Sequence, residues 1–133
     1  MDADNRKNAI LIVEDEVSLR AALHDKFTRE GFTVYEAKDG EEGLAIALAE
    51  RPQLILLDMM MPKMDGMTML KLLRSTNEWG ATIPVLILTN FGEDDKLLMK
   101  IIQDDPSTRY LVKSNWSINQ IVEKIREAIA HTA

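Results

Sequence analysis

Short runs of apolar residues recur along the chain, each separated from the next by a longer amphipathic stretch. The runs cover residues 9–13, 32–36, 53–57, 84–88 and 110–112. β-Branched and aliphatic side chains dominate them, and their short length is typical of strands rather than helices. We therefore predict five strands. The near-continuous apolar runs LILL at 54–57 and VLIL at 85–88 indicate strands that are buried on both faces.

Each predicted strand is followed by a helical pattern with recognisable ends. The first helical segment repeats large apolar residues at a spacing of four and ends at Gly31. The second begins with a capping box of Asp39 and Glu42 and ends before Pro52. The third and fourth predicted helices cover residues 67–74 and 94–103.

The last helix has the most complete set of signals. Ser117 and Gln120 form a capping box, and apolar residues then recur at helical spacing from Ile118 to Ile129. Strand and helix thus alternate five times along the chain. This alternation, with right-handed crossovers, predicts an α/β fold: a doubly wound, five-stranded parallel sheet in a (βα)5 arrangement.

Composition adds a domain organisation to this fold. The chain has 133 residues, of which 46% are hydrophobic and 29% charged, as is ordinary for one globular domain. We expect a short polar segment at 1–8, one domain over 9–131 and no output domain, because no linker-like stretch interrupts the sequence. Segment 1–8 lacks the apolar run of a signal peptide or a membrane span, which favours a cytoplasmic protein.

Charge and residue types narrow the chemistry. Asp and Glu number 22 against 16 Lys and Arg, so the net charge is −6. We therefore expect no direct binding to nucleic acid or to an anionic membrane, both of which require clustered positive charge. The chain has no cysteine and only two histidines, so any metal ion would be held by oxygen ligands.

Polar side chains follow four of the predicted strands at the points where those strands end. They are Glu14, Asp15 and Glu16 after the first strand, Asp58 after the third, Thr89 and Asn90 after the fourth, and Lys113 after the fifth. In an open parallel sheet, ligands bind at the carboxyl ends of the strands beside the topological switch point. The sequence therefore predicts a functional site at this edge.

These residue types fit phosphoryl transfer. Glu14, Asp15 and Asp58 would repel one another at close range, and Mg²⁺, which prefers carboxylate and phosphate oxygens, would offset that repulsion. Lys113 and Thr89 would supply a cation and a neutral donor. The chain lacks the glycine-rich nucleotide-binding motifs, so we predict that it accepts phosphate rather than binding ATP, with the carboxylate of Asp58 as nucleophile.

Four short motifs mark the ends of the first, third, fourth and fifth strands. They are ILIVEDE at 10–16, LILLDMMMPKMDG at 54–66, VLILTN at 85–90 and YLVKS at 110–114. In this order and at these separations, the chain resembles the receiver domain of two-component response regulators from Ala9 to the end of the fifth helix. The resemblance implies a flavodoxin-like receiver fold with strand order 2-1-3-4-5. It also implies Mg²⁺ as the required ion, and a sensor histidine kinase or phosphotransfer protein as the phosphoryl donor.

The resemblance assigns the acceptor and the metal ligands. Asp58 matches the phosphorylated aspartate, Asp15 would bind Mg²⁺ directly, and Glu14 would bind it through water. The implied metal ligands are Glu14, Asp15, Asp58 and the backbone carbonyl of Met60. Pro62 and Gly66 match the loop that shapes the site.

The resemblance also assigns the residues around the phosphoryl group. Thr89 and Lys113 match the residues that bind it. Asn90, which departs from the family pattern, would either add a hydrogen bond to the phosphate or narrow access to Asp58. Tyr110 matches the switch aromatic, which turns inward when Thr89 moves toward the phosphate. The change would then be reported by the face formed by the fourth helix, the fifth strand and the fifth helix.

The chain departs from the family pattern at several positions. Ser114 follows Lys113 where the family usually has proline, which puts the usual cis peptide in doubt. Asn90 stands where the family usually has a small residue. Met60 and Phe91 flank the acceptor, and our hypothesis is that these bulky apolar side chains hinder the attacking water and lengthen the phosphorylated lifetime.

The function predicted from the sequence is a single-domain, phospho-accepting response regulator that contacts a downstream protein target. We expect a monomer or a phosphorylation-dependent homodimer, and no enzymatic activity beyond its own phosphoryl transfer and dephosphorylation. One alternative is a phosphorylation-independent pseudo-receiver, against which the intact Asp15, Asp58, Thr89 and Lys113 argue. Another is a phosphatase of the haloacid dehalogenase type, which would have a second aspartate where this chain has Met60. A third is a receiver cut from a longer regulator.

Overall fold

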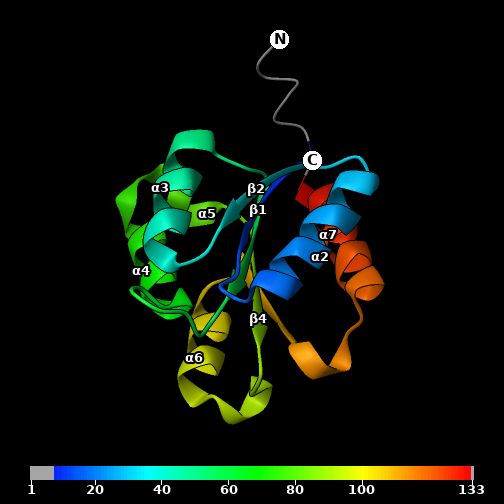
Figure 1. Ribbon diagram of the computed structural model, residues 1–133. Coiled ribbons are helices and arrows are strands. Elements are labelled where there is room, and N and C mark those ends of the chain that lie inside the picture. The colour runs from blue at the N-terminus through cyan, green and yellow to red at the C-terminus, as the bar shows by residue number, and fades with distance from the viewer. Residues whose placement is uncertain (1–7, 133) are drawn as a thin grey trace.

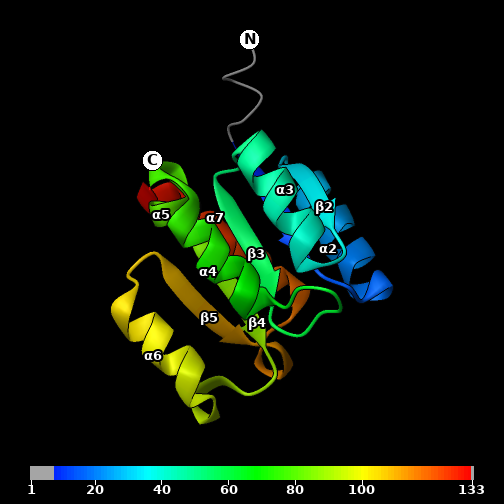
Figure 2. The ribbon, with the colours of Figure 1, turned by 90° about the vertical axis from the view of Figure 1, so that its left-hand side faces the viewer.

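The computed structural model describes residues 8–132 and shows one parallel sheet of five strands (Figure 1, Figure 2). The strands are β1 (Ala9–Val13), β2 (Thr33–Ala37), β3 (Leu54–Asp58), β4 (Val85–Thr89) and β5 (Thr108–Val112). Their order is β2-β1-β3-β4-β5, and each neighbouring pair is parallel, which confirms the predicted sheet. Apart from Asn8, the predicted polar segment 1–8 lies outside the described residues.

The predicted strand limits need small corrections that matter for the site. Strands β3 and β4 include Asp58 and Thr89 as their last residues, although both side chains are polar. In the sheet register Asp58 lies opposite Leu88, and Thr89 opposite Val112. The backbone of both residues is therefore fixed by the strand ladder rather than by a loop.

Helices cover both faces of the sheet. They are α2 (Val17–Arg29), α3 (Gly40–Glu50), α4 (Gly66–Thr76), α5 (Glu78–Thr82), α6 (Lys96–Asp104) and α7 (Ile118–Thr132), with 3₁₀ turns η1 (Gly92–Asp94) and η2 (Lys113–Asn115). Helices α2 and α7 pack on one face, and α3, α4 and α6 on the other (Figure 1). Ile10 and Ile12 of β1 join the first core and Leu11 and Val13 the second, because successive strand side chains point to opposite faces.

Of the two predicted capping boxes, the one at α7 forms completely and the one at α3 forms in part. At α7, the Gln120 N–H donates to Ser117 Oγ at 3.2 Å, and the Ser117 N–H donates to Gln120 Oε1 at 2.8 Å. At α3, the Glu42 N–H donates to Asp39 Oδ1 at 2.8 Å. The carboxylate of Glu42 accepts in return from the Lys38 N–H rather than from that of Asp39.

Two helical segments differ from the prediction. The helix predicted over 94–103 begins at Lys96, because Asp95 is its N-cap and accepts a hydrogen bond from the Leu98 N–H at 3.0 Å. Helix α4 continues to Thr76, and the short α5, which the sequence did not suggest, follows it directly with Asn77 as N-cap.

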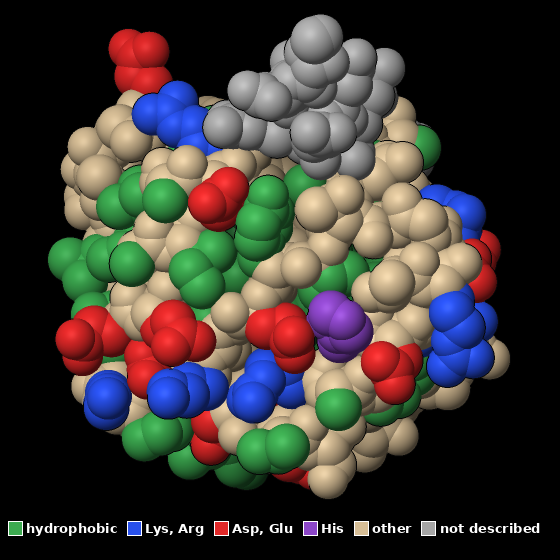
Figure 3. All heavy atoms as spheres, turned by 45° about the horizontal axis from the view of Figure 1, so that its top comes forward, with side chains coloured by type: hydrophobic (Ala, Val, Ile, Leu, Met, Phe, Trp, Pro, Cys, Tyr) green, Lys and Arg blue, Asp and Glu red, His purple; other side chains and the backbone are tan. Residues whose placement is uncertain are grey.

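The surface carries both signs of charge. Figure 3 shows acidic and basic side chains interspersed on the face in view, with apolar side chains between them. Among residues 8–132, no helix combines the length and the apolar content that crossing a membrane requires.

Candidate functional site

Three carboxylates meet at the carboxyl ends of β1 and β3. Oxygen atoms of Glu14, Asp15 and Asp58 all lie within 4.8 Å of one another, and we call these three residues the acidic cluster. The side chains of Glu14 and Asp58 are buried, whereas Asp15 is exposed. The strand order explains the meeting, because β1 and β3 are neighbours in the sheet and end at the same edge.

Lys113 supplies positive charge to the acidic cluster. It is the first residue after β5, and its Nζ lies 3.0 Å from Asp58 Oδ1 and 3.3 Å from Glu14 Oε1. The side chain of Lys113 is largely shielded from solvent. The ammonium therefore bridges two carboxylates that belong to different strands.

The backbone around Glu14 is held by contacts that the sequence did not suggest. The Glu16 N–H donates to Glu14 Oε2 at 3.0 Å, and Nη1 of Arg20 donates to the Glu14 carbonyl at 2.8 Å. Arg20 also lies 3.6 Å from a carboxylate oxygen of Glu36 on β2. A single arginine within a helix carries no distinctive sequence signal, so Arg20 could be found only from the structure.

The electrostatics of the site show a shortage of positive charge. The pKa of Glu14 is raised to about 7, because burial and, to a smaller extent, the nearby Asp58 outweigh the lowering effects of the Glu16 N–H and Lys113. Burial also raises the pKa of Asp58, although Lys113 partly offsets it. The pKa of Lys113 is raised, because the two carboxylates outweigh the opposite effect of burial.

One atom of the acidic cluster is left without a hydrogen bond. Glu14 Oε1 is buried and lies within ion-pair distance of Lys113 Nζ, but the geometry does not make a hydrogen bond among the described residues. A buried carboxylate oxygen normally has such a partner. The carboxylate of Glu14, together with those of Asp15 and Asp58, offers a set of hard oxygen ligands, which is compatible with Mg²⁺.

Thr89 lies at the end of β4, beside the strand that carries Asp58. Its side chain is buried, and its Oγ1 accepts a hydrogen bond from the Phe91 N–H at 3.2 Å. Because that bond uses only a lone pair, the hydroxyl hydrogen stays free to donate elsewhere. Asn90 is exposed and lines a cleft of about 240 Å³ together with Asp58 and Thr89.

Large apolar side chains surround this cleft. Met60 is 65% exposed and Phe91 58% exposed, and both line the cleft, as the sequence hypothesis requires. Leu97 of α6, 55% exposed, lines it as well and was not predicted. No sequence signal distinguishes Leu97 from the other apolar residues of this helix.

The loop after β3 passes very close to Asp58. The Gly66 N–H donates to the Met59 carbonyl at 3.0 Å, and a Cβ added at Gly66 would lie 2.3 Å from the Asp58 carbonyl oxygen. Only glycine fits there without movement of the chain. Pro62 accepts a hydrogen bond from the Met64 N–H at 2.7 Å, which closes a tight turn in the same loop. The loop that carries Pro62 and Gly66 thus packs directly against the backbone of Asp58, and its role in shaping the site stays a prediction.

The remaining predicted residues are placed as follows. Tyr110 of β5 is half-buried and packs against the core on the α6 side of the sheet. The described residues contain no cis peptide bond, so the bond between Lys113 and Ser114 is trans. The Met60 backbone carbonyl, which we predicted as a metal ligand, has no contact that tests this role.

Comparison with known proteins agrees with this arrangement. Residues 10–126 match the family described as the response regulator receiver domain. The chain is 37% identical over 128 residues to a probable transcriptional regulator, ycf27, of Porphyra purpurea, across 95% of this chain and 49% of that protein. It is 41% identical over 88 residues to sporulation initiation phosphotransferase F of Bacillus subtilis (strain 168), across 66% of this chain and 68% of that protein.

Solved structures show the same fold. The receiver domain of the Francisella response regulator 1452 matches with a TM-score of 0.79 and 28% identity, across 95% of this chain and 99% of that one. The Vibrio cholerae chemotaxis protein CheY4 matches with a TM-score of 0.77 and 27% identity, across 90% and 97%. The chain spans about half the length of the ycf27 regulators that it matches. Sequence, fold and site together place the chain in the family of response regulator receiver domains.

Proposed function

We propose that this chain is a phospho-accepting response regulator and that Asp58 takes a phosphoryl group from the phosphohistidine of a sensor histidine kinase or phosphotransfer protein. One observation carries the proposal. The buried carboxylate of Asp58 lies at a strand end, opens onto a cleft, and has a lysine ammonium 3.0 Å from Oδ1. This is the arrangement that a carboxylate nucleophile and its charge-neutralising partner require.

In the proposed reaction an oxygen of Asp58 attacks the phosphorus of the donor. A P–O bond forms, the P–N bond breaks, and the imidazole keeps the electron pair and takes up a proton. Lys113 holds the carboxylate in place and then pairs with the phosphoryl oxygens. The hydroxyl of Thr89, which keeps its hydrogen free, donates to another of those oxygens, and Asn90 lies at the mouth of the same cleft.

The acidic cluster is the proposed Mg²⁺ site, with the Met60 carbonyl as a further ligand. When bound, Mg²⁺ would neutralise negative charge on the transferring phosphoryl group. Glu14 and Asp15 hold the cation beside the acceptor. Removal of either carboxylate is therefore expected to weaken both metal binding and phosphorylation.

Phosphorylation would act on the rest of the molecule through Thr89. The added oxygens would draw its hydroxyl toward Asp58, and the space released would admit the ring of Tyr110 from its half-buried position. The face formed by α6, β5 and α7 would report this change to a downstream protein. We propose signalling by contact in the cytoplasm, as a monomer or phosphorylation-dependent homodimer, without other enzymatic activity.

The direct test is incubation with Mg²⁺ and either acetyl phosphate or a phosphorylated histidine kinase, followed by intact-mass spectrometry. We expect one phosphoryl adduct that is stable to acid and labile to base, as an acyl phosphate is. Asp58→Ala should abolish it, and Asp25→Ala, at an exposed position on α2, should not. An adduct that persists in Asp58→Ala, or no adduct on the native chain with any donor, would contradict the proposal.

A further inference from the structure

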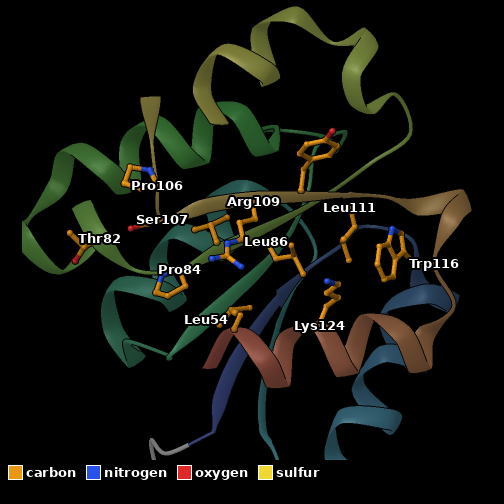
Figure 4. A pocket seen from close by; sticks show the side chains of 13 residues that line it. Leu54, Thr82, Pro84, Leu86, Pro106, Ser107, Arg109, Leu111, Trp116 and Lys124 are labelled. Atoms are coloured by element: carbon orange, nitrogen blue, oxygen red, sulfur yellow. The ribbon is translucent and has the colours of Figure 1, made fainter. Parts of the chain in front are cut away.

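A second cleft, of about 310 Å³, lies between strand β5, at the edge of the sheet, and helix α7 (Figure 4). Leu54, Leu86 and Leu111 from three neighbouring strands line it on the sheet side, and Trp116 and Ala128 line it from the side of α7. The residues that precede β4 and β5 complete the lining. The cleft therefore extends to the amino ends of the strands, the edge opposite the acidic cluster.

The cleft exists because one position on β5 breaks the pattern of the sheet. Leu111 is buried in the core on the α7 side, so Arg109, two residues earlier, faces the same side. Arg109 lies opposite Leu86 in the strand register. An apolar side chain there would pack over Leu86 and the small Ala128. Figure 4 shows instead the long Arg109 side chain reaching into the space between β5 and α7.

The cleft has the opposite charge to the whole chain. Arg109 and Lys124 line it and no carboxylate does, although the chain has a net charge of −6. Among the described residues, neither cation forms an ion pair. Nζ of Lys124 lies 5.5 Å from the centroid of the Trp116 ring, so this charge is held over an aromatic face. Glu123 and Glu127 of α7 line an adjoining, more open depression, which shares Trp116 and Lys124 with the cleft.

We propose that this cleft binds a small organic anion with a flat apolar body, such as an aromatic carboxylate. The body covers the leucines beside Trp116 and removes their surface from water. The carboxylate pairs with Arg109, whose planar guanidinium matches carboxylate geometry, and with Lys124. The volume of about 310 Å³ lies at the low end of the range of roughly 300–1,000 Å³ for small-molecule sites, which favours one or two rings over a peptide.

This proposal does not depend on the phosphoryl-transfer function. The cleft shares no residue with the acidic cluster or with the cleft beside Asp58. The proposed switch residue Tyr110 does line it, so anion binding is measured on the unphosphorylated chain. Binding of the anion and phosphorylation of Asp58 can therefore be measured separately, and failure of one assay leaves the other unaffected.

The test uses the full chain, labelled with ¹⁵N and titrated with 2-naphthoate while amide resonances are recorded. We expect saturable shifts centred on Leu86, Arg109 and Leu111. The neutral analogue 2-naphthamide, which has the same rings, should bind at least about tenfold more weakly, because it lacks the charge that the two cations recognise.

Matched variants separate the charge from the apolar surface. Arg109→Gln and Lys124→Gln should each weaken naphthoate binding at least about fivefold and leave naphthamide binding unchanged. Lys100→Gln, at an exposed position on α6, should alter neither. Ala128→Leu should fill the cleft and abolish binding of both compounds. The amide spectrum of each variant reports whether the fold is retained, and the two Gln variants decide the outcome if Ala128→Leu does not fold.

Four results would overturn the proposal. They are no saturable binding of naphthoate, equal affinity for naphthamide, shifts centred away from the cleft, and unchanged affinity in a folded variant that carries both Gln substitutions. If the native chain did not bind naphthoate and Ala128→Leu changed the sedimentation mass, the cleft would be identified as an interface between copies of the chain instead.

Discussion

Nε of Arg74 lies 2.7 Å from Oδ2 of Asp105, although 31 positions separate the two residues in the sequence. The same guanidinium donates to the carbonyls of Gly80 and Ile83 and to the hydroxyl of Thr108. It therefore connects α4, α5, the segment before β4 and the start of β5. A planar fork of N–H donors can reach this many acceptors at once, which a lysine ammonium cannot.

Replacement of Arg74 should be costly. We expect Arg74→Ala to lower the free energy of unfolding by about 2–4 kcal/mol, because it leaves two carbonyls in a partly buried region without this donor and removes the ion pair of Asp105. Urea denaturation at neutral pH measures the change. Arg29→Ala, at an exposed position on α2, should stay within about 0.5 kcal/mol of the native chain. A decrease in the free energy of unfolding below about 1 kcal/mol for Arg74→Ala would show that water takes over the hydrogen bonds that Arg74 makes.

The same network should make stability depend on pH. Burial alone would raise the pKa of Asp105, but hydrogen bonds from Thr108, Arg74 and the Ser107 N–H outweigh it and hold the pKa below its usual value of 3.8. The folded chain thus binds this proton less readily than the unfolded chain does. The stabilisation is therefore fully present above pH 3.8 and is lost as the pH falls through the lowered value.

Asp105→Asn tests this dependence. The difference in free energy of unfolding between the native chain and Asp105→Asn should be constant near neutral pH and should shrink below about pH 4. Urea denaturation at a series of pH values measures it. A difference that does not change down to pH 2 would mean that hydrogen bonding rather than the charge of Asp105 provides the stabilisation.

The architecture was predictable because parallel strands buried on both faces produce apolar runs that stand out in any sequence. The ends of the strands were not, since Asp58 and Thr89 are polar and resemble loop residues, while the ladder register holds them in the sheet. Helix α5 escaped prediction for a similar reason. Arg74 stabilises it from outside through a hydrogen bond to the Gly80 carbonyl, and local propensity gives no sign of that contact.

The candidate site was predictable as far as strand order determined it. Asp58 ends β3 and Lys113 directly follows β5, and their 3.0 Å approach follows from the order of the sheet. Arg20 and Leu97 act from helices through contacts with a loop and a cleft, which no local pattern encodes. The cleft beside α7 depends on a small side chain, Ala128, where a larger one would fit, and only the structure shows such a space.

Replacement of Asp58 should stabilise the fold when divalent cations are absent. The pKa of Asp58 is raised by burial, so at pH 8 its charged form disfavours folding, while Asn carries no charge. We expect Asp58→Asn to raise the free energy of unfolding by about 0.5–2 kcal/mol, a common cost of a functional residue. Urea denaturation in the presence of a chelator measures the difference.

Two controls apply to that variant. Asp25→Asn removes an exposed charge from α2 and should have no effect beyond about 0.5 kcal/mol. Addition of Mg²⁺ at about 100 times its dissociation constant should stabilise the native chain by about 2.7 kcal/mol and Asp58→Asn by much less. Equal stabilisation of both chains by Mg²⁺ would place the ion away from Asp58.

The apolar side chains at the mouth of the site should control the phosphorylated lifetime. Met60 and Phe91 are largely exposed and line the cleft beside Asp58, where they would hinder an incoming water. We expect Met60→Asn and Phe91→Asn each to speed loss of the phosphoryl group by about threefold to tenfold, a change of roughly 0.7–1.4 kcal/mol in the barrier. Loss of the adduct with time is followed by intact-mass spectrometry.

Leu72→Asn is the control for Met60→Asn and Phe91→Asn. Leu72 is also an exposed apolar residue, but it lies on α4 and does not line the cleft. The phosphorylated lifetime of Leu72→Asn should equal that of the native chain. An unchanged rate in both Met60→Asn and Phe91→Asn would refute the hypothesis that they shield the acceptor. An accelerated rate in Leu72→Asn would indicate a general effect on stability instead.

Substitution of Gly66 should shift the backbone of Asp58. A Cβ at this position would lie 2.3 Å from the Asp58 carbonyl oxygen, closer than such atoms approach, so either the loop or the end of β3 must move. We expect Gly66→Ala to lower the free energy of unfolding by about 1–3 kcal/mol and to slow phosphorylation as well. Thr68→Ala, at an exposed position in the first turn of the same helix, should leave both unchanged. If Gly66→Ala lost stability but kept the native phosphorylation rate, the loop would have moved and the strand end would have held. Loss of both would show that the position of Asp58 depends on the close packing of this loop.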